Sequence, residues 1–187
     1  VYNCTFMNNK AANDGGAVYL TGDNGVVSNC SFVNSTASNQ GGAVYLSGDN
    51  CVVSNSSFVN SSAKHEGGAV YLKDDNGVVS NCSFVNSSST LYEGGAVYFN
   101  SQNGVVSNCS FVNSSAKKDA GAVYMKGKNA ALSNCSFVNS CSTSHEGGAV
   151  FWTSADGILS NCSFVNSSAK MKGGTVYWEG TKGIVSI

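Results

Sequence analysis

The sequence predicts an all-β fold, a right-handed parallel β-helix of about seven coils of 26–27 residues, built as a single domain over residues 1–187. Three observations predict it. One phrase recurs along the whole chain, the apolar residues fall in short runs rich in Val, Tyr and Phe, and no window keeps a helical period of 3.6 residues. The right hand follows the general preference for right-handed crossovers between parallel strands.

The repeated phrase is Ser-Asn-Cys-Ser-Phe-Val-Asn-Ser, followed in each repeat by Gly-Gly-Ala-Val-Tyr. From Phe6 onward the phenylalanines recur at steps of 26, 26, 26, 27, 26 and 27 residues, at Phe32, Phe58, Phe84, Phe111, Phe137 and Phe164. The first position of each glycine pair lies a constant number of residues before the Phe of the next repeat. Each inserted residue therefore lies between a Phe and the following Gly-Gly, and that stretch is predicted to be a surface loop.

Each repeat is expected to contain three short strands, at residues 16–20, 26–28 and 30–33 in the second coil. Asp23-Asn24-Gly25 separates the first two as a turn, and Asn29 joins the last two. A propeller blade needs about 40 residues, and a sandwich would not repeat its side chains so closely. Three strands per turn, stacked in register, therefore indicate a β-solenoid.

Stacking accounts for the composition. Like residues of adjacent coils lie about 4.8 Å apart, so a column of like charges repels whereas columns of Asn or aromatic residues stabilise themselves. Only 11% of the residues are charged, and proline is absent. One asparagine column is predicted at Asn34, Asn60, Asn86, Asn113, Asn139 and Asn166, and another at Asn29, Asn55, Asn81, Asn108, Asn134 and Asn161.

The phrases Phe-Val-Asn-Ser-Ser and Gly-Gly-Ala-Val-Tyr resemble the paired Phe-x-x-Asn and Gly-Gly-Ala-Ile repeats of chlamydial polymorphic outer-membrane proteins. The fuller Val-Val-Ser-Asn-Cys-Ser-Phe-Val-Asn-Ser-Ser-Ala is similar to adhesin-like surface proteins of methanogenic archaea. The resemblance covers residues 1–187 and implies right-handed β-helices that are exported and displayed on the cell surface. The chain departs from the pattern at Ser56, where other repeats have Cys, and at Ala120, where others have Gly.

Six of the eight cysteines occupy one column, Cys4, Cys30, Cys82, Cys109, Cys135 and Cys162. Disulfides between adjacent coils stay open, but in-register side chains point the same way, so buried thiols are preferred. Because one column gives no tetrahedron, a metal site is not expected. Cys51 and Cys141 stand outside the column, and each is predicted to be either a free surface thiol or an intermolecular link.

Twelve Asn-x-Ser/Thr sequons occur, which are glycan acceptors in exported proteins. They coincide with the asparagine columns, and the preferred interpretation is that inward-turned ladder asparagines create sequons by accident.

Acidic residues form two columns, which offer weak Ca²⁺ binding or, in the preferred interpretation, turn capping. The members are Asp23, Asp49 and Asp75, and then Asp14, Glu66, Glu93, Asp119 and Glu146.

Tyrosines form an aromatic column at Tyr19, Tyr45, Tyr71, Tyr98, Tyr124 and Tyr177, with Phe151 in one coil. If the neighbouring Val18 and Leu20 point inward, these rings form an exposed stripe that can stack on sugars or on a neighbouring fibre. If not, the tyrosines belong to the core. The exposed stripe is slightly favoured, and it is the predicted surface contact.

These features predict a non-enzymatic structural or adhesive protein of the cell surface, extracellular, without a cofactor. Its expected partners are further copies stacked head to tail, because both ends match in register and lack polar caps, and glycans or a neighbouring cell surface. Nucleic acid is not expected without arginine, nor is a membrane-spanning segment. The alternative is a carbohydrate-binding or polysaccharide-cleaving β-helix protein; an ice-binding protein is disfavoured because threonine columns are missing.

Overall fold

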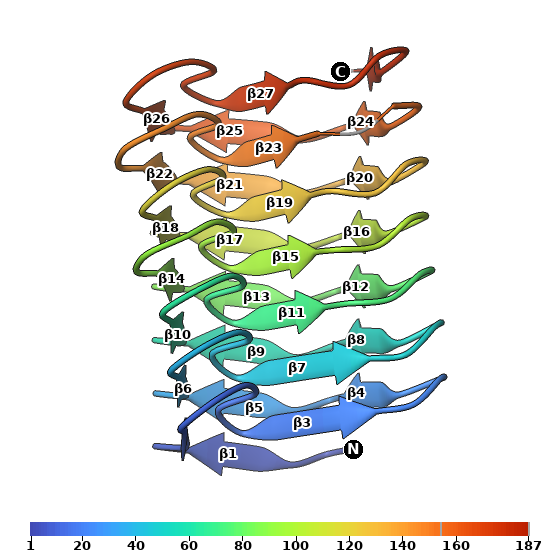
Figure 1. Cartoon of the computed structure of the whole chain (residues 1–187), viewed down its shortest axis with the longest axis vertical. Coiled ribbons are helices and arrows are strands. Elements are labelled where there is room, and N and C mark those ends of the chain that lie inside the picture. The colour runs from blue at the N-terminus through green and yellow to red at the C-terminus, as the bar shows by residue number, and fades with distance from the viewer. Residues whose placement is uncertain (154, 187) are drawn as a thin grey trace.

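The computed structural model describes residues 1–153 and 155–186, and these form a parallel β-helix of seven stacked coils (Figure 1). All strand pairs are parallel and join each strand to its counterpart one coil away. The predicted fold class is therefore confirmed. Each coil, however, contributes four strands rather than three, so four seven-stranded sheets run along the axis. We name each sheet after its first strand.

The β1 sheet and the β4 sheet arise from the repeated Ser-Phe-Val and Val-Val-Ser runs, whose alternation places every second side chain in the interior. The strands of the β1 sheet are β1 (Thr5–Met7), β5 (Ser31–Val33), β9 (Ser57–Val59), β13 (Ser83–Val85), β17 (Ser110–Val112), β21 (Ser136–Val138) and β25 (Ser163–Val165). Those of the β4 sheet are β4 (Val26–Ser28), β8 (Val52–Ser54), β12 (Val78–Ser80), β16 (Val105–Ser107), β20 (Ala131–Ser133), β24 (Ile158–Ser160) and β28 (Ile184–Ser186).

The β3 sheet follows each glycine pair. Its strands are β3 (Val18–Thr21), β7 (Val44–Ser47), β11 (Val70–Leu72), β15 (Val97–Phe99), β19 (Val123–Met125), β23 (Val150–Trp152) and β27 (Val176–Trp178). They begin two residues later than predicted. The reason is a local irregularity in the ladder, since the N–H groups of Ala17 and Val18 both donate to the carbonyl oxygen of Ala43, each over 2.9 Å.

The β2 sheet was not predicted. Its two-residue strands are β2 (Lys10–Ala11), β6 (Thr36–Ala37), β10 (Ser62–Ala63), β14 (Ser88–Ser89), β18 (Ser115–Ala116), β22 (Cys141–Ser142) and β26 (Ser168–Ala169). They lie inside the stretch predicted to be a loop, and the loop itself follows them. Because Ser88 pairs in register with Ser62 and Ser115, the extra residue of that coil falls between β14 and Gly94.

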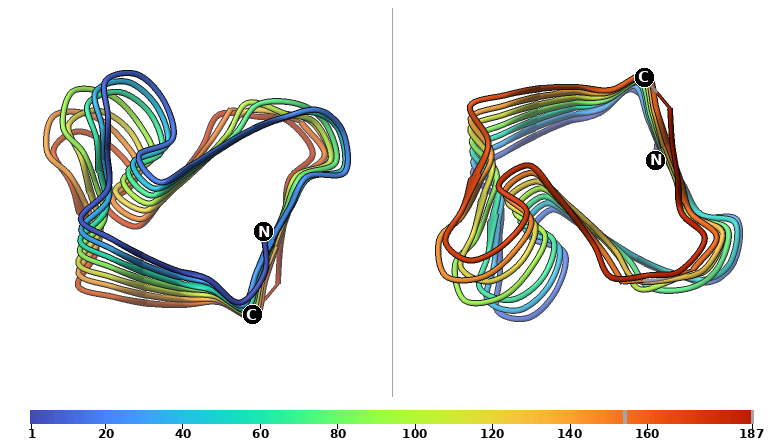
Figure 2. Two further views of the ribbon diagram at one scale, coloured as in Figure 1. Left: turned by 90° about the horizontal axis from the view of Figure 1, so that it is seen from below. Right: turned by 90° about the horizontal axis from the view of Figure 1, so that it is seen from above.

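Viewed along the axis, the coil is an irregular polygon from which the loop between the β2 and β3 strands projects as a lobe (Figure 2). The interior is filled by apolar columns. Phe32, Phe58, Phe84, Phe111 and Phe137 are fully buried, and consecutive rings stack at 4.8–4.9 Å. The described residues contain no helix, and so none that could cross a membrane.

Candidate functional site

A groove of about 1370 Å³ runs the length of the molecule where each β4-type strand meets the following β1-type strand. Each coil contributes one tripeptide to it, consisting of an Asn, a Cys or Ser, and a Ser or Thr. The lining tripeptides are Asn3–Thr5, Asn29–Ser31, Asn55–Ser57, Asn81–Ser83, Asn108–Ser110, Asn134–Ser136 and Asn161–Ser163. The groove therefore offers amides and hydroxyl groups at one repeat per coil.

The asparagines of the groove make the corner of the coil. Each of them, for example Asn81 with φ of 53°, adopts the left-handed conformation that Asn tolerates better than other residues with a side chain. This bend is why β5 begins at Ser31 and not at residue 30 as predicted. The side chains of the groove asparagines are exposed, and the described structure contains no side-chain hydrogen bond from Asn29, Asn55, Asn81, Asn108 or Asn134.

The second asparagine column behaves differently, although its members are also exposed and left-handed. Their amides form a ladder. Asn86 Nδ2 donates to Asn60 Oδ1 over 3.0 Å, and Asn60 Nδ2 donates to Asn34 Oδ1 over 3.0 Å. The same bonds join Asn34 to Asn8, Asn113 to Asn86 and Asn139 to Asn113 at 2.9–3.1 Å. The predicted asparagine ladder is thus confirmed for one column as far as Asn139.

The expectation that ladder asparagines turn inward is wrong. A left-handed residue at a corner directs its side chain outward, while the residues that flank it continue into strands. The position behind Asn86 is instead occupied by Ser87, which is fully buried. Sequence reasoning missed this serine column, Ser35, Ser61, Ser87, Ser114 and Ser140, whose hydroxyl groups have no partner among the described residues. The only signal was a Ser after every ladder Asn from Asn34 onward.

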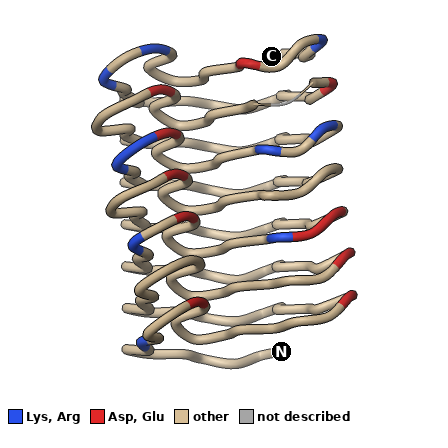
Figure 3. The backbone as a smooth tube through the Cα atoms, viewed as in Figure 1, with Lys and Arg blue, Asp and Glu red and all other residues tan. Residues whose placement is uncertain are grey.

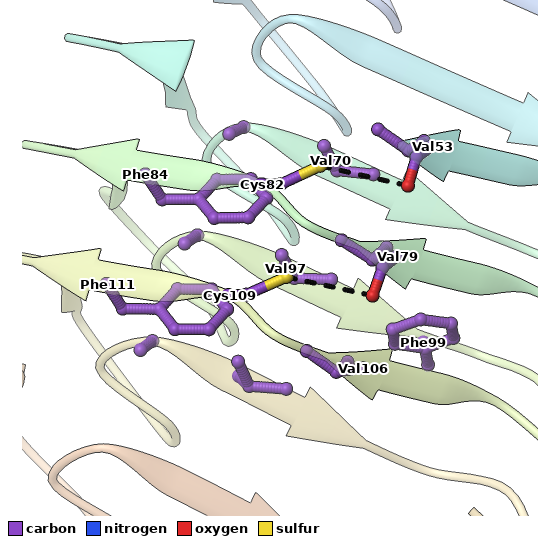
Figure 4. Close-up of a cluster of buried hydrophobic side chains, with 14 of the residues drawn as sticks. Val53, Val70, Val79, Cys82, Phe84, Val97, Phe99, Val106, Cys109 and Phe111 are labelled. Carbon is purple, nitrogen blue, oxygen red and sulfur yellow. Dashed lines mark hydrogen bonds between the residues drawn. The ribbon is translucent and has the colours of Figure 1, made fainter. Parts of the chain in front are cut away.

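The cysteine column lies inside the core, two residues before the phenylalanines. Cys82 and Cys109 are 3% exposed, and their Sγ atoms donate to Ser80 O and Ser107 O, each over 3.1 Å. Weaker contacts reach the carbonyl groups of Val53 and Val79, in the coil before (Figure 4). All eight cysteines are free, so the coil pairings left open as disulfides are not formed. The column holds buried thiols at its inner members, whereas Cys4 is exposed and Cys162 is half-buried.

The surroundings shift the pKa values of these thiols in different directions, and a hydrogen bond with Cys109 lowers the pKa of Cys82. A hydrogen bond with Cys109, together with burial, raises the pKa of Cys135 to about 12, against the opposing effect of Cys162. At Ser56 the hydroxyl donates to Ser54 O over 2.7 Å and accepts the Cys30 N–H over 3.1 Å. Serine therefore replaces cysteine there without leaving its polar atom unpaired, and the departure from the repeat is structurally tolerated.

The tyrosine column was predicted to be an exposed stripe, and this is wrong for the inner coils. Tyr45, Tyr71 and Tyr98 are only 5–7% exposed and stack on one another at 5.2 Å. The premise was correct, because Val44 and Leu46 point into the core. The conclusion failed because the loop before each β3-type strand covers the outer face. Tyr19, in the first coil, remains 53% exposed, while Tyr124 and Tyr177 are half-buried.

The covering loop brings polar groups to the tyrosine hydroxyls. Burial raises the pKa of Tyr45 to about 12, helped by the nearby carboxylate of Asp14. Burial and Glu66 raise the pKa of Tyr71, whereas a hydrogen bond with Gln40 lowers it. The rings thus form a second aromatic core between sheet and loop rather than a binding surface.

The two cysteines outside the column have different surroundings. Cys51 is 1% exposed, because the turn glycine it replaces packs against the core, and burial raises its pKa. A surface role for Cys51 is therefore wrong. Cys141 lies in β22, not in the loop, and is half-buried. Its role as an intermolecular link remains a prediction.

The carboxylates of the turn cap the next coil. Asp23 Oδ1 accepts the N–H of Asp49 over 2.9 Å, and Asp49 Oδ1 accepts that of Asp75 over 3.0 Å. In the other acidic column, Asp14 Oδ1 accepts the N–H of Gln40 over 3.0 Å. Within the described part of the chain no three His, Cys, Asp or Glu side chains gather as metal ligands. Charged residues follow the loop edges (Figure 3), and none lines the groove.

Comparison with known families gives one match. The model of the right-handed β-helix region matches residues 1–169. Searches of curated proteins and of solved structures returned no match. The family match agrees with the parallel sheets and with the predicted right hand of the coil.

Proposed function

The chain belongs to the right-handed β-helix family, and from this premise we propose that it is a non-enzymatic structural or adhesive component of the extracellular cell surface. Its coils stack end to end with further coils into a stalk or filament. Glycans or a neighbouring cell surface are the proposed contacts.

The observation that carries this proposal is the unbroken register of the four sheets. Every sheet contains seven strands in line, so backbone hydrogen bonds run parallel to the axis from one end of the molecule to the other. Stacked phenylalanines inside and the asparagine ladder outside follow the same direction. Such a rod resists extension along its axis, because lengthening it breaks many bonds at once.

The end coils support further stacking. Ile184 and Val185 of β28 are 58% and 62% exposed, although their counterparts in the inner coils are half-buried or buried. A second molecule stacked on this coil would cover them and pair with the open edge of the strand. An association that repeats head to tail without closing forms a filament.

Immunogold labelling of intact cells, together with surface biotinylation of the lysines, tests the proposal. We expect label on the outside, on fibres or stalks. Concentration-dependent light scattering by the isolated chain tests the stacking, and a monomer that persists at high concentration counts against it. Label confined to the cell interior would refute the extracellular role.

A second candidate is a carbohydrate-binding or polysaccharide-cleaving β-helix protein, and the groove favours the binding role, because no charged residue lines it. Uncharged amides and hydroxyl groups repeat along it at one coil spacing, which suits a neutral linear glycan. Incubation of the purified chain with neutral and uronate-rich polysaccharides separates the candidates. Retention without cleavage supports the binding protein, and cleavage abolished by one carboxylate substitution supports the enzyme.

A further inference from the structure

We propose that the groove asparagines are acceptors of N-linked glycans, which would form a fringe along one edge of the solenoid. The inference rests on the proposed extracellular location, since sequons are modified in exported proteins. It commits to the column of Asn29, Asn55, Asn81, Asn108 and Asn134, and excludes the ladder-bound sequons at Asn34, Asn60, Asn86 and Asn113.

The proposal rests on one structural coincidence. The residues that line the groove are the same residues that make up the sequons. Each of the seven tripeptides that line the groove is an Asn-x-Ser/Thr sequence. In the second coil, for example, the exposed amide of Asn29 and the half-buried hydroxyl group of Ser31 both border the same open space. The two groups that define a sequon are therefore presented together.

Hydrogen bonding separates the two columns chemically. The amide of Asn86 is engaged on both sides, because Nδ2 donates to Asn60 Oδ1 and Oδ1 accepts from Asn113 Nδ2. A sugar on that nitrogen would break the ladder in the coil where it is attached. The amide of Asn81 makes no side-chain hydrogen bond within the described chain, so its nitrogen can be modified without loss of a contact.

The modification is a glycosyl transfer by an enzyme of the producing cell. The donor is a sugar activated as a phosphate ester at its anomeric carbon. A bond forms between Asn81 Nδ2 and the anomeric carbon while the bond from that carbon to the phosphate oxygen breaks. The phosphate leaves with the electron pair, and the amide gives one proton to a base of the transferase.

Coil spacing limits how many acceptors are occupied. Adjacent coils are 4.8 Å apart, as the stacked rings of Phe58 and Phe84 show. A sugar ring with its hydroxyl groups is wider than this spacing, so neighbouring acceptors exclude one another. We expect at most every second groove asparagine to carry a glycan in one molecule, with the occupied positions differing between molecules.

The test is peptide mapping of the protein isolated from the cells that make it. The chain is denatured and digested with chymotrypsin. Phe84 lies between Asn81 and Asn86, and Tyr71 lies between Asn60 and Asn81, so cleavage after phenylalanine and tyrosine puts the two columns on separate peptides. Enzymatic release of the glycan converts each modified Asn to Asp, which mass spectrometry detects. We expect this conversion only on peptides with groove asparagines.

Matched variants sharpen the test. Ser83→Ala removes the sequon hydroxyl and should abolish modification of Asn81, whereas Ser83→Thr should retain it. Ser88→Ala removes the sequon of Asn86 and should leave the glycan pattern unchanged. Carbohydrate on the ladder column, or on neither column, would overturn the proposal.

Surface biotinylation of the same cells distinguishes the two levels of failure. An unmodified protein that is labelled at the surface refutes the glycan acceptors alone. An unmodified protein found only inside the cell refutes both the acceptors and the extracellular function.

Discussion

The side-chain amide of Asn86 donates to Oδ1 of Asn60 over 3.0 Å, although both residues sit at exposed corners and both have positive φ, of 53° and 54°. Asparagine satisfies two requirements of this corner position. Asparagine tolerates the left-handed backbone, and its amide can both donate and accept along a column. The asparagine ladder is consequently formed at the exposed corners of the coils, and the packing of the interior does not depend on it.

Replacement of Asn86 by Ala should destabilise the fold by about 1–3 kcal/mol, through a strained left-handed alanine and lost ladder bonds. Asn86→Gly should cost less, because glycine adopts positive φ freely. Urea denaturation compares the two variants. Equal losses would show that the amide bonds, rather than the backbone conformation, account for the effect.

Replacement of Phe84 by Ala should cost about 3–5 kcal/mol, the usual loss for a buried aromatic side chain. The ring is fully buried and stacks on Phe58 at 4.8 Å and on Phe111 at 4.9 Å. Val85→Ala, on the outer side of the same strand, is the control and should cost less than about 1 kcal/mol. A melting temperature equal to that of the wild type would contradict the stacked core.

The second glycine of each pair should be far less replaceable than the first. Ala120 occupies the first position naturally, with φ of 59°. At the second position, a Cβ on Gly68 would overlap the carbonyl oxygen of Gly95 in the next coil. We expect Gly68→Ala to cost more than about 3 kcal/mol and Gly67→Ala about 1–2 kcal/mol. Thermal unfolding of both variants provides the comparison, and the reverse order would refute this account.

Alkaline pH should unfold the protein through its buried tyrosines. Tyrosine titrates near pH 10 in an unfolded chain. Burial raises the pKa of Tyr45 to about 12 and raises those of Tyr71 and Tyr98 as well. Because the folded state holds these protons more tightly, their contribution to stability is complete below pH 10 and is lost as pH rises toward 12 and beyond.

Absorbance of tyrosinate and circular dichroism, recorded together against pH, test this prediction. The ionisation of buried rings should coincide with unfolding. Tyr71→Phe should shift the alkaline midpoint upward, since Phe151 shows that the column accepts phenylalanine. Tyr2→Phe, at a position that is 60% exposed, should not shift it.

Thiol labelling should distinguish the two cysteines outside the column. In the native protein, we expect a maleimide to modify the half-buried Cys141 well before Cys51, which is 1% exposed and whose pKa is raised by burial. Cys4 is also free and exposed, so the test uses a Cys4→Ser background. In that background, oxidation should give dimers that disappear in Cys141→Ser and persist in Cys51→Ser. Dimers that depend on Cys51 would mean that the turn around it opens.

The repeat length, the columns and the parallel stacking could all be read from the sequence, because one residue type recurs at one spacing. Phe32, Phe58 and Phe84 are in register for that reason alone. The sequence also indicated the loop before each glycine pair, since only a loop absorbs an extra residue. It did not reveal the two-residue strands of the β2 sheet, which are too short to carry an alternating pattern.

Which way each column faces was decided only by the tertiary structure. Alternation along a strand predicts Tyr71 outside, yet the lobe folds back over that face and buries the ring. Asn29 and Asn34 are the same residue type in neighbouring corners, but only the amides of the second column come close enough to bond from coil to coil. A spacing along the chain determines which residues share a column; the bend of the backbone at each corner determines what that column meets.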